Sequence, residues 1–159
     1  MSLTTILSRE HQVILSRLGE LEDALKDLDL AMLEDVLRFF EADLPLHRRK
    51  EEEILFPVLA RHIGAEGGPI SAMLAEHETE KAYLEDLRRA VNEVKSGADA
   101  GGAVRSSATA ILFLLRAHIQ KEDEFLFPMA EQFLTDEEKA EVGRAMEAIG
   151  TCCSQCRVT

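Results

Sequence analysis

The chain has 159 residues, 46% of them hydrophobic and 30% charged, and a formal net charge of −12. This length suits one domain with a single continuous core, and the composition excludes a disordered chain. A surface this acidic repels phosphate backbones and anionic lipids. We therefore expect neither a nucleic acid nor a membrane as a partner.

The N-terminal sequence lacks the basic, apolar and small-residue pattern of a signal peptide. The longest apolar run covers residues 110–115, far below the roughly 20 residues that a membrane span needs. We therefore expect a cytoplasmic location.

Four long helices are predicted in chain order. Apolar residues recur at alternating steps of three and four from Leu3 to Leu28, Leu33 to Val58, Ile70 to Val94 and Val104 to Met129. A weak break near Leu30 and two clear ones, "GAEGGP" at 64–69 and "SGADAGG" at 96–102, separate these segments. A seam of this kind with short connections predicts an all-α fold, an antiparallel up-down four-helix bundle over residues 1–134. Within it, kinks are expected at Pro45, Pro57 and Pro128.

A shorter fifth helix is predicted over residues 135–150, packed on or beside the bundle. Thr135 suits its N-cap, Glu138 follows three residues later, and Gly150 would end it. Residues 151–159 form a tail that carries Cys152, Cys153 and Cys156. Three thiols are too few for a four-thiolate metal site, so we expect a free tail. Contact with a redox partner and binding of a soft metal are the alternatives.

Six ionisable residues occupy places in the apolar seam. They are His11, His47, Glu51, His77, His118 and Glu122, and the pairs 47/51 and 118/122 each project from one helical face. Any one of them alone would be read as a hydrogen-bonded core residue. Burying six such groups without partners in one small core would reduce the free energy of unfolding, on the order of several kcal/mol for each group. Something must therefore pair with them. Metal ions are the simplest partner, since imidazole and carboxylate groups are good ligands for iron.

The two halves of the chain carry the same motif. "HRRKEEEILFP" begins at His47 and "HIQKEDEFLFP" at His118, and seven of the eleven positions are identical. Each half thus supplies a histidine, a long interval, and then His-x-x-x-Glu. Two such halves packed about a pseudo-twofold axis would hold two metal ions and share two carboxylates.

This constellation resembles the hemerythrin-like, or HHE cation-binding, family, from His11 to about Phe133. Ferritin-like di-iron proteins, the rival, use Glu-x-x-His instead. The resemblance implies a non-haem di-iron centre, bridged by oxide or hydroxide, that binds, senses or reacts with dioxygen, nitric oxide or peroxide. Carried over residue by residue, it assigns His11 and His47 to one iron, His77 and His118 to the other, and Glu51 and Glu122 as bridges.

Two positions depart from the oxygen-carrying members of that family. Those proteins place a further histidine where this chain has Met73, so we do not expect reversible oxygen storage here. They also bridge with an aspartate at the position of Asp123. Glu122 is preferred because it keeps the seam and matches Glu51, and Asp123 is the alternative.

Several functions stay open at this point. The chain could bind or sense a small oxidant, consume peroxide or nitric oxide as an enzyme, handle and donate iron, or serve as a structural metallo-bundle that docks a partner. No catalytic residue is assigned. Lys81, one turn after His77, either donates a proton to the site or extends to the solvent. We expect His62 on the surface and the run "RRKEEE" on a solvated helix face. The oligomeric state is not set by any of these patterns.

Overall fold

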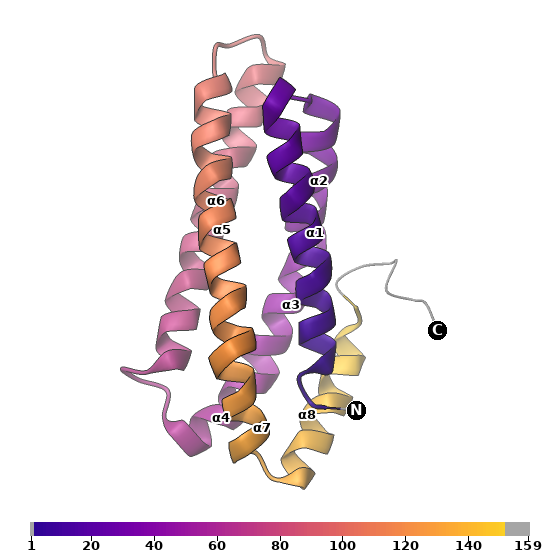
Figure 1. Cartoon of the computed structure of the whole chain (residues 1–159), viewed down its shortest axis with the longest axis vertical. Helices are drawn as coiled ribbons and strands as arrows, with labels where there is room; N and C mark the ends of the chain where they lie inside the picture. The colour runs from indigo at the N-terminus through magenta and orange to yellow at the C-terminus, as the bar shows by residue number, and fades with distance from the viewer. Residues whose placement is uncertain (1, 152–159) are drawn as a thin grey trace.

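The computed structural model describes residues 2–151, and every regular element in this part of the chain is helical (Figure 1). The α-helices are α1 (Thr5–Asp27), α2 (Leu30–Ala42), α3 (Leu44–Arg49), α4 (Phe56–Ile63), α5 (Pro69–Lys95), α6 (Gly101–Lys121), α7 (Phe127–Phe133) and α8 (Asp136–Ile149). Two π-helical turns, η1 (Lys50–Leu55) and η2 (Glu122–Leu126), interrupt them. The all-α prediction is confirmed. None of the described helices combines the length and apolarity required to cross a membrane.

Four helical arms lie along the long axis of the molecule (Figure 1). The first is α1, and the second runs through α2, α3, η1 and α4. The third is α5, and the fourth runs through α6, η2 and α7. Helix α1 packs on α2 and α6, while α5 packs on α6 and α2. The arms therefore enclose a common interior, into which the seam residues point.

The apolar interior is divided into two clusters. One contains Leu18, Phe40 and Ile111, and the other contains Leu7 and Phe127. On the first three arms the predicted polar seam residues fall between the residues of the two clusters, and on the fourth arm His118 lies next to Ile119 at the edge of the first cluster, with Glu122 between the two. The ionisable groups thus form a layer that crosses the bundle, with apolar packing on both sides to keep water out.

Each π turn lies directly before a phenylalanine–proline pair. The backbone N–H of Phe56 donates to the carbonyl of Glu51, and that of Phe127 donates to the carbonyl of Glu122, five residues back in both cases. The proline that follows has no N–H, and its ring crowds the carbonyl four residues before it. A widened turn relieves this crowding, so the kinks predicted at these two prolines take the form of π turns. At Pro45 the arm instead breaks between α2 and α3.

A π turn adds one residue to the helical repeat, which changes the buried face beyond it. The seam was expected to continue through Ile54 and Val58 in the second arm, and through Phe125 and Met129 in the fourth. That expectation is wrong by one residue in both arms. The structure buries instead the next residues along, which are Leu55, Leu59, Leu126 and Ala130.

Helix α8 begins and ends where the sequence predicts. The Thr135 hydroxyl accepts from the backbone N–H of Glu138, the Glu138 carboxylate accepts from that of Thr135, and Gly150 follows the last turn at φ 94°. Val142 and Met146 join the second apolar cluster, and the helix packs on η1. In Figure 1 it lies beside the N-terminal end of α1.

Candidate metal centre

The six side chains predicted as ligands converge in the polar layer, and all six are buried. The Glu51 carboxylate lies 3.0 Å from His47 Nε2 through Oε1 and 3.1 Å from His77 Nε2 through Oε2. Glu122 Oε1 lies 2.7 Å from His118 Nε2 and 3.5 Å from His11 Nε2. Each carboxylate therefore faces one imidazole from each half of the chain.

The donor atoms form two overlapping groups, within each of which all atoms lie within 4.8 Å of one another. The first group is His11, His47, Glu51 and Glu122, and the second is Glu51, His77 and His118. Because Glu51 belongs to both, it is placed to bridge two ions. This division into histidine pairs is the one that the family resemblance implies.

All four imidazoles are held from behind by an outer carboxylate. Nδ1 of His11 lies 2.9 Å from Asp123, and that of His47 lies 3.2 Å from Glu10. In the other half, Nδ1 of His77 lies 2.7 Å from Glu52, and that of His118 lies 3.1 Å from Glu76. An Nδ1–H that donates to a carboxylate leaves the Nε2 lone pair free, and here every Nε2 faces the centre.

Sequence reasoning missed three of these outer carboxylates and considered Asp123 only as a bridge, although the chain carries a signal for all four. Glu10 and Glu76 directly precede the first histidine of each half, and Glu52 and Asp123 directly follow the two predicted bridges. An acidic neighbour at corresponding places in both halves could have indicated a second layer. Asp123 is half-exposed and bonded to His11, whereas Glu122 is buried in the centre. The geometry thus favours Glu122 over Asp123 as the inner carboxylate.

Other residues of the repeated motif contact the predicted ligands or their outer carboxylates. Lys50 Nζ donates to Glu10, and Lys121 Nζ donates to Glu76. The ring of Phe127 stacks on His11 with 5.2 Å between centroids, and that of Phe56 stacks on His77 at 6.0 Å. The pseudo-twofold relation therefore extends from the predicted ligands to the groups that support them.

The run "RRKEEE" is not a solvated face throughout. Lys50 is buried against Glu10, and Arg48 is buried with its Nη1 2.5 Å from Glu80 Oε1. Burial raises the pKa of Glu80, against the attraction of Arg48. Charged helix residues bury in this way when each meets a partner of opposite sign. The sequence shows the charges but not which arm will cover them.

The carboxylates shift the protonation of the histidines strongly. Burial favours the neutral imidazole, but the charge of the adjacent Glu51 and the hydrogen bond to Glu10 outweigh it and raise the pKa of His47 to about 10. His118 is likewise desolvated, yet Glu122 leads the interactions that raise its pKa to about 9. Burial raises the pKa of Glu51, but the positive charge of His47 holds it well below its usual range. The layer thus attracts positive charge.

The centre also contains buried donors that the protein leaves unsatisfied. Among the described residues, the buried side-chain atoms without a hydrogen-bond partner are His11 Nε2 and both carboxylate oxygens of Glu51 and of Glu122. They lie close enough to other site atoms for charge attraction, but not in hydrogen-bonding geometry. Orphaned buried polar atoms are rare and costly, and cations coordinated among them would satisfy all of them together. The nitrogen and oxygen donors present fit iron.

The charge of the layer matches two divalent ions. The inner carboxylates, the four outer ones and Glu80 make seven negative groups, and Arg48, Lys50 and Lys121 make three positive ones. With neutral imidazoles, four negative charges remain uncompensated. Two divalent cations would neutralise them.

Other residues weighed from the sequence lie apart from the centre. Lys81 Nζ pairs with Glu78 at 2.8 Å on the surface, which does not support a proton-donor role. His62 pairs with Glu138 of α8 at 2.8 Å. Met73 packs in the second apolar cluster, four residues before His77, as Leu7 does four residues before His11. The expectation for Cys152, Cys153 and Cys156 falls outside the described residues.

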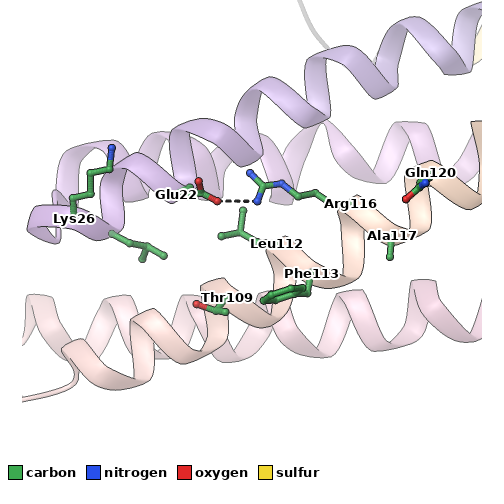
Figure 2. Close-up of a pocket in the computed structure, with 9 residues that line it drawn as sticks. Glu22, Lys26, Thr109, Leu112, Phe113, Arg116, Ala117 and Gln120 are labelled. Atoms are coloured by element: carbon green, nitrogen blue, oxygen red, sulfur yellow. Dashed lines mark hydrogen bonds and ion pairs between the residues drawn. The ribbon is translucent and has the colours of Figure 1, made fainter.

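A groove of about 610 Å³ opens between α1 and α6 (Figure 2). Leu112 and Phe113 supply apolar surface, and Arg116 Nη1 donates to Glu22 across it at 2.8 Å. None of the six predicted ligands lines this groove. The candidate metal centre is instead closed within the bundle.

Comparison with known proteins gives the following matches. A family described as Hemerythrin HHE cation binding domain matches residues 2–148. The iron-sulfur cluster repair protein YtfE of Dickeya chrysanthemi (strain Ech1591) is 36% identical over 102 residues, which cover 62% of this chain and 46% of the relative. The proteins of the same name from Enterobacter sp. (strain 638) and Escherichia coli O81 (strain ED1a) are 34% and 33% identical over 98 residues, covering 59% of this chain and 44% of each. The chain thus matches less than half the length of these relatives.

Proposed function

Because this chain belongs to the hemerythrin HHE cation-binding domain family, we propose that it holds two non-haem iron ions and uses them to bind, sense or react with dioxygen, nitric oxide or peroxide. The family match confirms the resemblance inferred from the repeated motif. The observation that carries the proposal is the pair of buried carboxylates, Glu51 and Glu122, whose oxygens face four imidazoles without hydrogen-bonding to them.

In this proposal His11 and His47 hold one iron, His77 and His118 hold the other, and the two carboxylates are shared. The arms that carry them form an antiparallel up-down four-helix bundle. Two groups of donor atoms that share Glu51, one of four residues and one of three, support two ligand sets, and each contains two histidines held by outer carboxylates. When bound, iron supplies Lewis acidity and electrons to a small ligand.

The chain's own residues prepare the site for this ligand. The outer carboxylates orient the four imidazoles, and the rings of Phe56 and Phe127 cover two of them against water. Met73 leaves the second half without an additional nitrogen donor, so each side has two histidines. We therefore propose that the protein reacts with or senses its ligand and does not store oxygen reversibly.

The expected partners are a small diatomic molecule or peroxide, and a redox partner that could use Cys152, Cys153 and Cys156. Nucleic acid and membranes are not expected as partners, because the net charge is −12. A cytoplasmic location remains part of the proposal.

A second candidate is iron donation. The relatives found by comparison are named iron-sulfur cluster repair proteins, and a protein with that task could give up metal from its centre. In this alternative, iron is cargo that leaves the site, and the outer residues regulate its release. Docking of a partner on a purely structural metal bundle is the remaining alternative.

The test begins with anaerobic loading of the full chain with ferrous iron and elemental analysis. Two irons per chain are expected, and one would overturn the di-iron centre. The loaded protein is then exposed separately to dioxygen, nitric oxide and peroxide while its optical spectrum is recorded. A spectral response to at least one of them supports the first candidate. Two bound irons without any response, but with transfer to a cluster-free acceptor protein, would favour donation.

A further inference from the structure

The two halves of the centre use the same support but bury it to different extents. In the first half the side chains of His47, Glu10 and Lys50 are 4%, 3% and 1% exposed. In the second half their counterparts His118, Glu76 and Lys121 are 5%, 20% and 46% exposed. The hydrogen-bonded residues Glu10 and Lys50 behind His47 are therefore closed off from solvent, whereas Lys121, which pairs with Glu76 behind His118, is exposed to water.

The difference in burial does not extend to the other two outer carboxylates. The other outer carboxylates, Asp123 behind His11 and Glu52 behind His77, are 31% and 30% exposed. They match each other closely and so provide an internal reference. The outer carboxylates behind His11 and His77 are thus equally exposed. Only the outer partners of His47 and His118 differ in exposure.

The fold supplies a reason for the asymmetry. Helix α8 has no counterpart between the two repeated motifs, and it packs on η1, which begins at Lys50. Lys121 lies at the end of α6, on the arm that carries the second copy. Helix α8 therefore lies against the arm that carries Lys50.

We propose that the two iron positions are held unequally, and that the iron bound by His77 and His118 exchanges with solvent before the iron bound by His11 and His47. This inference rests on the proposed di-iron function. For an iron to leave, its histidines must move and break their outer hydrogen bonds. Water can replace those bonds at Glu76 and Lys121, but opening the buried Glu10–Lys50 pair would leave two charges without a partner in the interior.

The experiment follows iron loss from the full chain after anaerobic loading and analysis of its iron content. An excess of a coloured ferrous chelator is added, and its absorbance is recorded with time. We expect two phases of equal amplitude. Two irons that leave in a single phase would overturn the inference alone, whereas loading of one iron would already overturn the proposed di-iron centre and the inference with it.

Matched variants identify which half releases first. Glu76→Gln should accelerate the fast phase about tenfold, the lower end of the effect of losing an outer partner, and leave the slow phase unchanged. Glu10→Gln should accelerate only the slow phase. Asp123→Asn and Glu52→Gln, whose parent residues are equally exposed, should change the two phases by similar factors.

A structural measurement keeps the inference testable if Glu10→Gln does not fold. The wild-type protein is stopped after the fast phase, and the remaining iron is located by anomalous diffraction. It is expected between His11 and His47. Iron remaining between His77 and His118, or shared equally between both positions, would overturn the assignment.

Discussion

Each histidine of the centre has two different neighbours, a carboxylate of the inner pair at Nε2 and an outer carboxylate at Nδ1. The inner oxygens lack hydrogen bonds, whereas the outer ones accept from the imidazole ring. A change of one atom, from carboxylate oxygen to amide nitrogen, should therefore have different consequences in the two layers.

Replacement of Glu122 by Gln should abolish binding of at least one iron, because an inner donor and its negative charge are lost. Asp123→Asn should retain two irons and weaken their binding by about 10- to 100-fold, as expected for an outer partner. Iron content and competition with a chelator measure both effects. If Asp123→Asn loses iron while Glu122→Gln retains it, the adjacent aspartate is the bridge.

The histidine pKa values predict how the metal-free protein responds to pH. The pKa of His47 is raised from 6.5 to about 10 and that of His118 from 6.5 to about 9. Their contribution to folding is therefore complete below about pH 6.5 and is lost as the pH rises through 9 and 10. The lowered pKa of Glu51 acts in the opposite direction, and its contribution is lost on acidification below 4.5.

The melting temperature of the metal-free protein should accordingly fall between pH 6.5 and 10. Thermal unfolding followed by circular dichroism at a series of pH values measures this. Iron-loaded protein is the control, since coordinated imidazoles are already deprotonated and should not show the same decline. A metal-free melting temperature that is constant over this range would contradict the assigned protonation.

At the scale of the helical elements, the π turns determine which residues reach the core. Each π turn follows the helix that carries a predicted ligand histidine, and it begins at or next to the inner glutamate. The additional residue rotates the rest of the arm, so that Leu126 is buried and Phe125 is 63% exposed. The larger aromatic residue faces out because the turn is wide, not because the position is polar.

This rotation predicts opposite results for two adjacent substitutions. Leu126→Ala should reduce the free energy of unfolding by about 2–5 kcal/mol, the usual cost of truncating a buried leucine. Phe125→Ala should change it by about 0.5 kcal/mol or less, as for a surface position. Urea unfolding of the metal-free forms measures both. A larger loss for Phe125→Ala would mean that the arm continues as an unbroken α-helix.

At the scale of the whole molecule, the polar layer divides an otherwise apolar interior. The clusters on both sides hold the arms together, while the layer between them contains buried carboxylate oxygens without hydrogen-bond partners. Folding and metal binding should therefore be coupled, because ions that bind only the folded state stabilise it by mass action.

Iron loading should raise the free energy of unfolding by about 4 kcal/mol at a thousandfold excess over the dissociation constant. Anaerobic thermal unfolding with and without ferrous iron measures the shift. A variant without the inner carboxylates, Glu51→Gln with Glu122→Gln, should show little stabilisation by iron. Equal melting temperatures for the iron-free and iron-loaded wild type would place the metal outside the core.

The helical class, the approximate extent of the arms and the convergence of six ionisable residues all follow from the sequence. The three- and four-residue spacing is a property of the α-helix itself, so it can be read wherever the helix is regular. The repeated His-x-x-x-Glu motif places each pair on one face for the same reason. The capping of α8 is equally local, since Thr135 and Glu138 each bond to the other's backbone within one turn.

Tertiary structure alone decided the burial of the supporting charges, and only the structure showed that the kinks at Pro57 and Pro128 are π turns that rotate each arm by one residue. Lys50 and Arg48 look like solvated residues by their spacing, yet they are buried because Glu10 and Glu80 on other arms meet them. The outer bonds to the histidines likewise join residues distant in sequence. The unequal burial of Lys50 and Lys121 is also absent from any periodicity within the two motifs, because the arms pack on different neighbours, α8 among them.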